Sequence, residues 1–250
     1  MNWMEKKLTG LSIPFERFPA VDWYNGTNYE KMKQVRESLH PSTKMDLESV
    51  RQSLAVNHSF ALNWGSVGCW QSHLQVYLQI AEGSASHLPG PFLILEDDVK
   101  ISPRILEILS YDYLYHYLPF DWEMLFLEHL YLLCHQNEPV WRRPRDYSIE
   151  KQFCSVKFTY TTSAYVIRNP AVAAKLIAQA NTDYVQVADW FFNFLFRSKT
   201  IRAYAVLKKV VKQAHETFQT DIQFSDGSTT KTETITEKLW AEAVKKDDAV

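Results

Sequence analysis

The chain has 250 residues, 46% of them hydrophobic, and a formal net charge of −2 at pH 7. This length and hydrophobic content predict one large domain with a sizeable core. Charged residues make up 22% of the chain and both signs are interspersed, so the sequence offers no basic surface for a phosphate backbone. A nucleic acid partner is therefore not expected.

The N-terminal residues lack a basic segment followed by an apolar run, and no stretch approaches the roughly 18 apolar residues of a membrane helix. We therefore expect a cytoplasmic protein without a membrane span, with a secretory lumen as the alternative if the N-terminus is incomplete. The three cysteines, Cys69, Cys134 and Cys154, are odd in number and have no paired spacing. We expect them to be reduced and buried.

The predicted elements begin with a helix over residues 2–11 and a short strand over 13–23. Residues 26–60 are charged with a weak helical pattern, which indicates an insertion on the surface. Apolar residues at helical spacing predict a helix over 65–83. The run PFLIL, residues 91–95, is typical of a strand that is buried on both faces.

Two more buried strands are predicted over residues 122–127 and 163–167. Ser102-Pro103 and Asn169-Pro170 each place a capping side chain before a proline, which is typical of the start of a helix. This alternation predicts an α/β domain with a mainly parallel sheet flanked by helices.

Residues 128–158 have no period and are predicted to form a long loop. Within it, Trp141 and the arginines of WRRPR form either an acceptor-binding lip or a solvated basic loop. The polar stretch after residue 225 predicts a tail with one short helix over 236–246. We thus place one domain at 1–224 and a tail at 225–250.

An acidic triplet, Glu96-Asp97-Asp98, directly follows the strand at 91–95. Alternate side chains of an extended segment share a face, so Glu96 and Asp98 are expected to converge while Asp97 points away. Ligands of open α/β sheets bind beyond the carboxyl ends of strands, and hard divalent cations prefer carboxylate oxygens. The triplet is therefore a candidate site for Mg²⁺ or Mn²⁺ on a nucleotide diphosphate, or else a solvated turn that caps the next helix.

The chain resembles glycosyltransferase family 25, which includes bacterial lipooligosaccharide galactosyltransferases and the collagen galactosyltransferases of animals. The resemblance rests on segments that occur in the family's order: IPFERFPAVDW (13–23), GSVGCWQSH (65–73), PFLILEDDV (91–99), TTSAYVIRNPAVAAKLI (161–177), the aspartate of QVADWFF (185–191) and FQTDIQ (218–223).

This resemblance implies a GT-A-like, Rossmann-like fold whose first strand is missing from this chain. It also implies inverting transfer of a hexose, galactose or glucose, from a UDP-sugar to a hydroxyl of a glycan or a hydroxylated protein, assisted by Mn²⁺ or Mg²⁺. The alternatives are an inactive relative that binds a sugar or a protein and, more remotely, a metal-dependent phosphoesterase.

The expected site residues follow from the triplet and the matching segments. Asp98 is the leading metal ligand, with Glu96 beside it and His215 as a further candidate. Asp189 precedes an apolar helical run and is expected to be the general base for the acceptor hydroxyl, or else a plain N-cap. The candidates for donor binding are Gly65, Gly68, Ser72, His73, Glu96, Asp97 and Asp221. Of these, the glycines are alternatively turn or cap residues, and His73 is alternatively a hydrogen-bonded core histidine.

Overall fold

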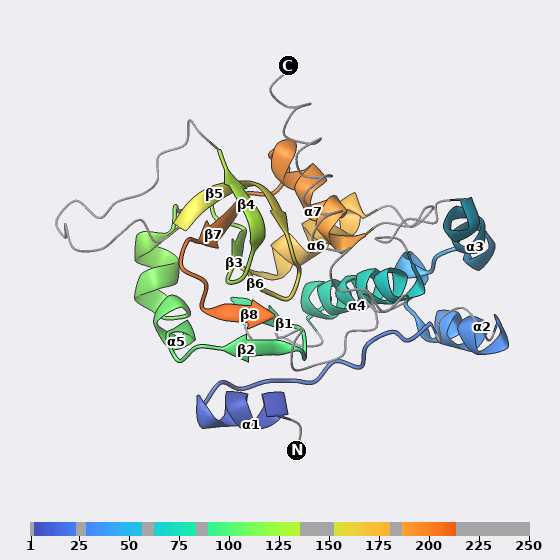
Figure 1. Ribbon diagram of the computed structural model, residues 1–250, viewed down its shortest axis with the longest axis horizontal. Coiled ribbons are helices and arrows are strands. Elements are labelled where there is room, and N and C mark those ends of the chain that lie inside the picture. Colours follow the sequence, from blue (N-terminus) through green and yellow to red (C-terminus); the bar gives the residue numbers. More distant parts are fainter. Residues whose placement is uncertain are drawn as a thin grey trace, which may run out of the picture.

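A six-stranded sheet with the order β1-β6-β3-β7-β5-β4 forms the centre of the molecule (Figure 1). The computed structural model describes residues 3–23, 29–56, 63–83, 90–135, 153–180 and 187–213. The strands of this sheet are β1 (Phe92–Leu95), β3 (Met124–Phe126), β4 (Leu130–Cys134), β5 (Phe153–Tyr160), β6 (Ala164–Ile167) and β7 (Ala203–Val206).

The prediction of a mainly parallel sheet is wrong. Among the neighbouring strands of this sheet only β3 and β7 run parallel, while β1·β6, β3·β6, β5·β7 and β4·β5 are antiparallel. A continuous apolar run reports burial on both faces of a strand, and it carries no information on the direction of the neighbouring strand. Mixed α/β architecture is confirmed, and the strands predicted at 91–95, 122–127 and 163–167 are β1, β3 and β6. The prediction that 91–95 is buried on both faces is wrong, because β1 is an edge strand of the sheet and only Ile94 in it is buried.

The sheet separates two hydrophobic cores, because alternate strand residues face opposite sides. Ile94, Phe126 and Tyr165 belong to one core, whereas Leu125 and Val166 belong to the other. The first core is covered by α4 (Trp64–Ala81), α6 (Pro170–Gln179) and α7 (Ala188–Arg197). The second is covered by α1 (Trp3–Gly10), α5 (Ile105–Ile108), a π-helical turn (Tyr113–Tyr117) and a two-stranded sheet of β2 (Val99–Ile101) and β8 (Val211–Gln213).

Residues 29–56 belong to the core instead of forming a purely superficial insertion. They fold into α2 (Tyr29–Ser38), η2 (Pro41–Thr43) and α3 (Leu47–Val56). Their helical pattern is weak because few apolar residues point inward, but Met32, Met45 and Val50 are buried in the core under α4. The segment 13–23, predicted as a strand, is extended without strand pairing and packs on α4 through Trp23.

Helix α4 has clear start and stop signals. Asn63 accepts a hydrogen bond from the backbone N–H of Ser66, and the Ser66 hydroxyl accepts one from the backbone N–H of Asn63. This reciprocal pair satisfies N–H groups that the first turn of a helix leaves open. Beyond the last turn, Gly83 has a φ of 73°, a left-handed conformation that glycine adopts without strain. The predicted helix at 65–83 is thus confirmed.

The two proline-marked helix starts differ. Asn169 caps α6 by accepting a hydrogen bond from the N–H of Val172, as predicted. Ser102 does not cap α5, which begins two residues later than expected after a turn, with Arg104 at its N-cap. The serine hydroxyl accepts from the N–H of Arg104 within that turn.

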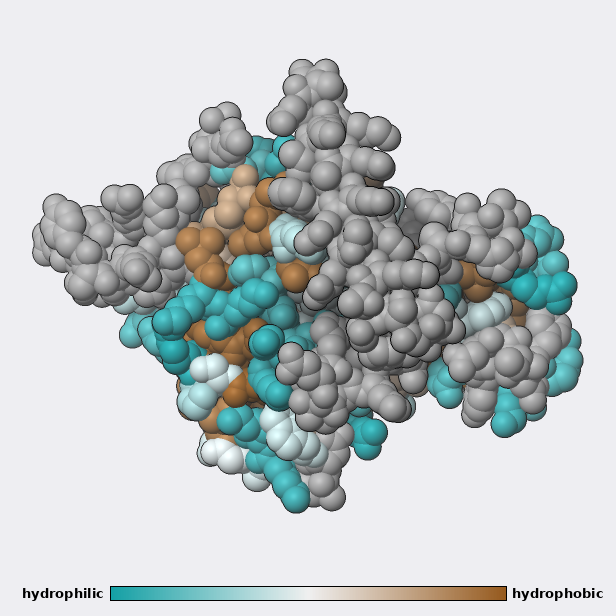
Figure 2. Space-filling model, viewed as in Figure 1, coloured by the Kyte–Doolittle hydropathy of each residue, from teal (hydrophilic) through white to brown (hydrophobic). Residues whose placement is uncertain are grey.

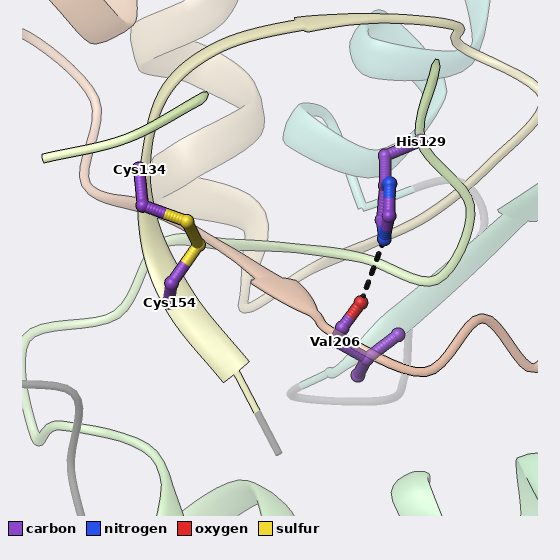
Figure 3. The surroundings of a disulfide bond; sticks show 4 residues. All are labelled: His129, Cys134, Cys154 and Val206. Atoms are coloured by element: carbon purple, nitrogen blue, oxygen red, sulfur yellow. Dashed lines mark hydrogen bonds between the residues drawn. A yellow bond between two sulfur atoms is a disulfide. The ribbon is translucent and has the colours of Figure 1, made fainter. Parts of the chain in front are cut away.

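Strands β4 and β5 lie where a loop over 128–158 is predicted, and a disulfide between Cys134 and Cys154 joins them (Figure 3). The prediction of three reduced thiols is therefore wrong for two of them, and only Cys69 is free. Cys134 pairs with Val156 across the antiparallel ladder, which brings the two cysteines within 5.9 Å, Cα to Cα. A sequence separation of 20 residues gives no sign of that proximity.

The surface over β4 and β5 is hydrophobic on the side shown in Figure 2. Figure 2 shows apolar side chains over β4 and β5, above a hydrophilic band over the turn that leads from β7 to β8. Leu130 contributes to the apolar side, with 48% of its surface exposed. Within the described residues, no helix combines the length and the apolar character that crossing a membrane requires.

Candidate functional site

Two carboxylates converge where β1 ends. The ladder of β1 with β6 continues one residue past the strand, because the N–H of Glu96 donates to the carbonyl of Ser163 at 2.8 Å. The side-chain amide of Gln213, at the end of β8, donates to Asp98 Oδ2 at 3.0 Å and approaches Glu96 Oε2 at 3.4 Å. Asp97 is exposed. Glu96 and Asp98 thus come together as predicted, but Asp97 and Asp98 lie in a turn and not in an extended segment, and the Gln213 amide joins the two carboxylates.

The second oxygen of Glu96 faces a different set of side chains. Oε1 accepts a hydrogen bond from the Thr162 hydroxyl at 2.9 Å and lies 3.5 Å from Nε2 of His73 and 4.0 Å from Sγ of Cys69. Glu96 therefore joins two groups of residues, with one carboxylate oxygen directed to each.

His73 is held from its other nitrogen by a chain of tyrosines. Its Nδ1 lies 2.7 Å from the hydroxyl of Tyr165, which lies 2.7 Å from the hydroxyl of Tyr77. All three side chains are buried. His73 is thus a hydrogen-bonded core histidine that also neighbours the acidic site, and its role in donor binding stays a prediction.

Asp189 lies in the first turn of α7, and the residue at the N-cap is Val187. The plain N-cap alternative is therefore excluded. Burial, and after it the charge of Glu96, raises the pKa of Asp189 from its ordinary 3.8 to about 7, against the opposing effects of a hydrogen bond from the Thr161 backbone and of the nearby His73. An aspartate with this pKa can accept a proton near neutral pH and is therefore suited to general base chemistry.

The segment that supports Asp189 contains an unusual backbone conformation. Thr161 has a φ of 110°, where a β-branched residue is strained. Its hydroxyl lies 2.8 Å from the Ser163 hydroxyl and accepts from the Ser163 N–H at 3.2 Å. These two contacts hold the turn that presents Thr161 to Asp189.

Glu128 is a buried acid that the sequence analysis does not single out. It comes two residues after the end of β3, near the position that Glu96 takes directly after β1, so a similar pattern of an acid after an apolar strand marks it. Its carboxylate accepts from the Ser163 hydroxyl at 3.0 Å and from the backbone N–H of Gln213. Burial raises its pKa, while Ser163 and Lys209 oppose that change. Glu128 thereby fixes Gln213, the residue that bridges Glu96 and Asp98.

Cys69 and Thr162 are also near Glu96 and were not expected there. Burial raises the pKa of the Cys69 thiol well above its ordinary value, and the charge of Glu96 adds to the effect. The spacing of Cys69 and His73, one helical turn apart, is the sequence signal that places both on the same face of α4 as that carboxylate.

Gly68 and Ser72 hold the 13–23 segment against α4. A Cβ atom on Gly68 would lie 2.6 Å from the carbonyl oxygen of Val21, so only glycine permits this approach of the 13–23 segment. The Ser72 hydroxyl accepts from the Val21 N–H at 2.8 Å and donates to the Gly68 carbonyl at 2.7 Å. Gly65 lies in the first turn of α4. Donor binding by these three residues stays a prediction.

Other predicted features lie outside the described residues: His215, Asp221, the Trp141 loop and the tail. A pocket of about 460 Å³ opens at the opposite end of β3 and β7. Two ion pairs lie in its wall, Lys175 with Glu123 at 2.8 Å and Arg202 with Asp121 at 3.0 Å, and Arg168 and Lys199 add two further cationic side chains to it.

Comparison with known proteins identifies the family. The model of glycosyltransferase family 25 (LPS biosynthesis protein) matches residues 1–191. This match spans β1, the acidic triplet, α4 and Asp189. No curated protein matches the chain.

Proposed function

Since the chain belongs to glycosyltransferase family 25, we propose that it transfers a hexose, galactose or glucose, from a UDP-sugar to an acceptor hydroxyl with inversion. The acceptor is a glycan, as the family's link to lipopolysaccharide synthesis suggests, or a hydroxylated protein. The observation that carries the proposal is the position of Asp189, a carboxylate with a pKa of about 7 beside the acids that end β1.

In this mechanism Asp189 takes the proton of the acceptor hydroxyl as that oxygen bonds to C1 of the sugar. The bond from C1 to the diphosphate oxygen breaks with its electrons on the departing UDP, and displacement from the opposite face inverts the configuration at C1. The hydrogen bond from the Thr161 backbone orients the carboxylate for this transfer.

The residues at the end of β1 fit Mn²⁺ or Mg²⁺. Glu96 Oε2 and Asp98 Oδ2 both face the Gln213 amide, which carries positive partial charge, so two oxygen donors already converge on one electropositive group. Hard divalent cations prefer such oxygens and often take few of them from the protein when a phosphate supplies the rest. When bound, the ion would neutralise charge on the leaving diphosphate. Glu96 and Asp98 would hold it.

The experiment that tests this proposal is calorimetric titration of UDP into the protein with and without Mn²⁺. We expect binding that needs the metal and that Asp98→Ala weakens at least about 10-fold, since a metal ligand is lost. Asp112→Ala is the matched control, because Asp112 is an exposed aspartate at the start of the π-helical turn, outside the candidate site, and is expected to leave the affinity unchanged. Metal-independent binding of UDP, or equal affinities in the two variants, would contradict metal-assisted donor binding.

Turnover distinguishes the enzyme from an inactive relative. UDP release from UDP-galactose or UDP-glucose supports transfer, whereas metal-dependent UDP binding without any release favours a sugar-binding module. Asp189→Asn is expected to bind UDP normally and to lose turnover, because its amide cannot accept the acceptor proton.

A further inference from the structure

Three side chains with metal-binding atoms meet beside the acidic site. Cys69 and His73 lie one turn apart on α4, and Glu96 reaches them from the end of β1. The thiol sulfur, the free imidazole nitrogen and a carboxylate oxygen all lie within 4.8 Å of one another. Each comes from a side chain that is buried or partly buried.

The separations of Cys69 and His73 from Glu96 are close to those of a tetrahedral metal site. Zinc bonds of about 2.3 Å to sulfur and about 2.0–2.2 Å to nitrogen and oxygen place nitrogen and oxygen about 3.3 Å apart, and sulfur and oxygen about 3.6 Å apart. The observed values are 3.5 Å between His73 Nε2 and Glu96 Oε1 and 4.0 Å between Cys69 Sγ and that oxygen. The ligand atoms of Cys69 and His73 lie within 4.8 Å of each other. Tetrahedral zinc places sulfur and nitrogen about 3.6 Å apart, so metal binding would draw these two side chains together by up to about 1.2 Å.

The surroundings of His73 are those of a metal-ligating imidazole. Metal-bound histidines usually donate a hydrogen bond from their second nitrogen, which fixes the ring and leaves the first nitrogen free to ligate. Here Nδ1 contacts the Tyr165 hydroxyl at 2.7 Å, and Tyr165 in turn contacts Tyr77. With the proton on Nδ1, the lone pair of Nε2 faces Glu96 Oε1, an arrangement that a cation between the two would stabilise.

The local charge also favours a cation. Glu96 is close enough to Asp189 for its charge to contribute to the raised pKa of Asp189, and Asp98 lies beyond the Gln213 amide. Among the described residues, His73 is the one basic side chain within 4.0 Å of Glu96. Carboxylates grouped in a partly buried site without a permanent cation are stabilised by a bound metal ion.

We propose that Cys69, His73 and Glu96 bind a metal ion of the class that prefers thiolate and imidazole, Zn²⁺ in the first place. The thiol proton leaves to solvent as the sulfur–metal bond forms, and three protein ligands leave a fourth coordination position open. This site is distinct from the all-oxygen site at Asp98, because Glu96 offers Oε1 to the one and Oε2 to the other. It does not depend on the proposed transferase activity.

Cobalt substitution tests the site through the spectrum of the bound ion. Metal-free protein titrated with Co²⁺ should develop a thiolate-to-cobalt charge-transfer band at one equivalent, and Zn²⁺ should remove it. Cys69 is the only free cysteine of the chain, so the band reports on that residue. Cys69→Ser and, independently, His73→Gln should lose or displace the band, with circular dichroism showing that each variant is folded.

Two further variants sharpen the result. Tyr165→Phe keeps all three ligands and should weaken Zn²⁺ binding about 10–100-fold, because it removes the hydrogen bond that holds the imidazole. Asp98→Asn should keep the cobalt band while it loses metal-dependent UDP binding, so failure at one site is distinguishable from failure at the other.

Absence of the charge-transfer band from folded wild-type protein would overturn the proposal, as would equal Zn²⁺ affinities for wild type and Cys69→Ser. Either result would show that Tyr77, Tyr165, His73 and Glu96 form a hydrogen-bond chain without a metal ion.

Discussion

Asp189 and Glu96 come from α7 and the end of β1, and burial of Asp189 together with the charge of Glu96 raises the pKa of Asp189 to about 7. The two carboxylates are 93 positions apart in the printed sequence, so only the fold brings them into electrostatic contact. Their relationship makes the predicted general base sensitive to pH in the physiological range, and this sensitivity can be measured.

The first prediction concerns the pH profile. Transfer needs the ionised form of Asp189, so kcat/KM should fall as the pH drops through about 7. Glu96→Gln removes the charge that raises this pKa and should move the acid limb of the remaining activity to lower pH. Asp112→Asn, which changes an exposed carboxylate outside the candidate site, should leave the limb in place. An acid limb at the same pH in wild type, in Glu96→Gln and in the control variant would contradict the electrostatic coupling between Glu96 and Asp189.

The second prediction concerns stability. The folded-state pKa of Asp189 exceeds its ordinary value of 3.8, so ionisation of this group opposes folding. Its contribution to stability is fully present below about pH 4 and is lost as the pH rises through about 7. Asp189→Asn, which cannot ionise, should therefore be more stable than wild type by about 1–2 kcal/mol at pH 8.

Urea denaturation at pH 8 and at pH 4 measures this difference. At pH 4 the wild-type Asp189 side chain is protonated in the folded protein and carries no buried charge. The greater stability of Asp189→Asn should therefore disappear at this pH. A variant that is equally stable or less stable than wild type at pH 8 would contradict the buried, destabilising charge.

The third prediction concerns the disulfide between Cys134 and Cys154. A cross-link that closes a loop of this length stabilises a protein by about 3 kcal/mol. Cys134→Ser should lose about that much in the free energy of unfolding, and reduction of the wild type should cause a similar loss. Reductant should leave the stability of Cys134→Ser unchanged. If unfolded protein that has not been reduced shows three titratable thiols instead of Cys69 alone, the disulfide is absent.

The fourth prediction separates packing from ligand binding at Gly68. An added Cβ would meet the Val21 carbonyl at 2.6 Å, and both contacting groups are held by the backbone. Gly68→Ala should therefore destabilise the protein by about 1–3 kcal/mol. Gly10→Ala is the matched control, because nothing lies within 4 Å of the added atom. Thermal unfolding of both variants measures the effect, and equal melting temperatures would contradict the close approach.

Much of the site follows from local signals in the sequence. The apolar run before Glu96, the spacing within α4 and the Asn169-Pro170 start of α6 each depend on neighbouring residues, and the structure confirms these elements. The convergence of Glu96 and Asp98 is predicted from alternation in an extended segment, but in the structure these residues lie at a turn and meet through Gln213.

The parts that sequence reasoning missed depend on contacts between distant segments. The antiparallel sheet, the disulfide and the bridge of Gln213 to Asp98 each join residues whose proximity has no local signal. Glu128 carries a local signal, an acid after a buried strand, but its role becomes visible only through Ser163 and Gln213. Cys69 was judged by the spacing of the cysteines alone, although its position one turn before His73 places both side chains toward Glu96.

The measurement that tests the central claim most directly is release of UDP from UDP-galactose and UDP-glucose, with Mn²⁺ and a glycan acceptor, by wild type, Asp189→Asn and the exposed control Asp112→Asn. We predict metal-dependent release with at least one donor, a loss of about 100-fold or more in Asp189→Asn, and wild-type rates in Asp112→Asn. Metal-dependent turnover that survives unchanged in Asp189→Asn, or no turnover of either donor by folded wild-type protein, would contradict the account.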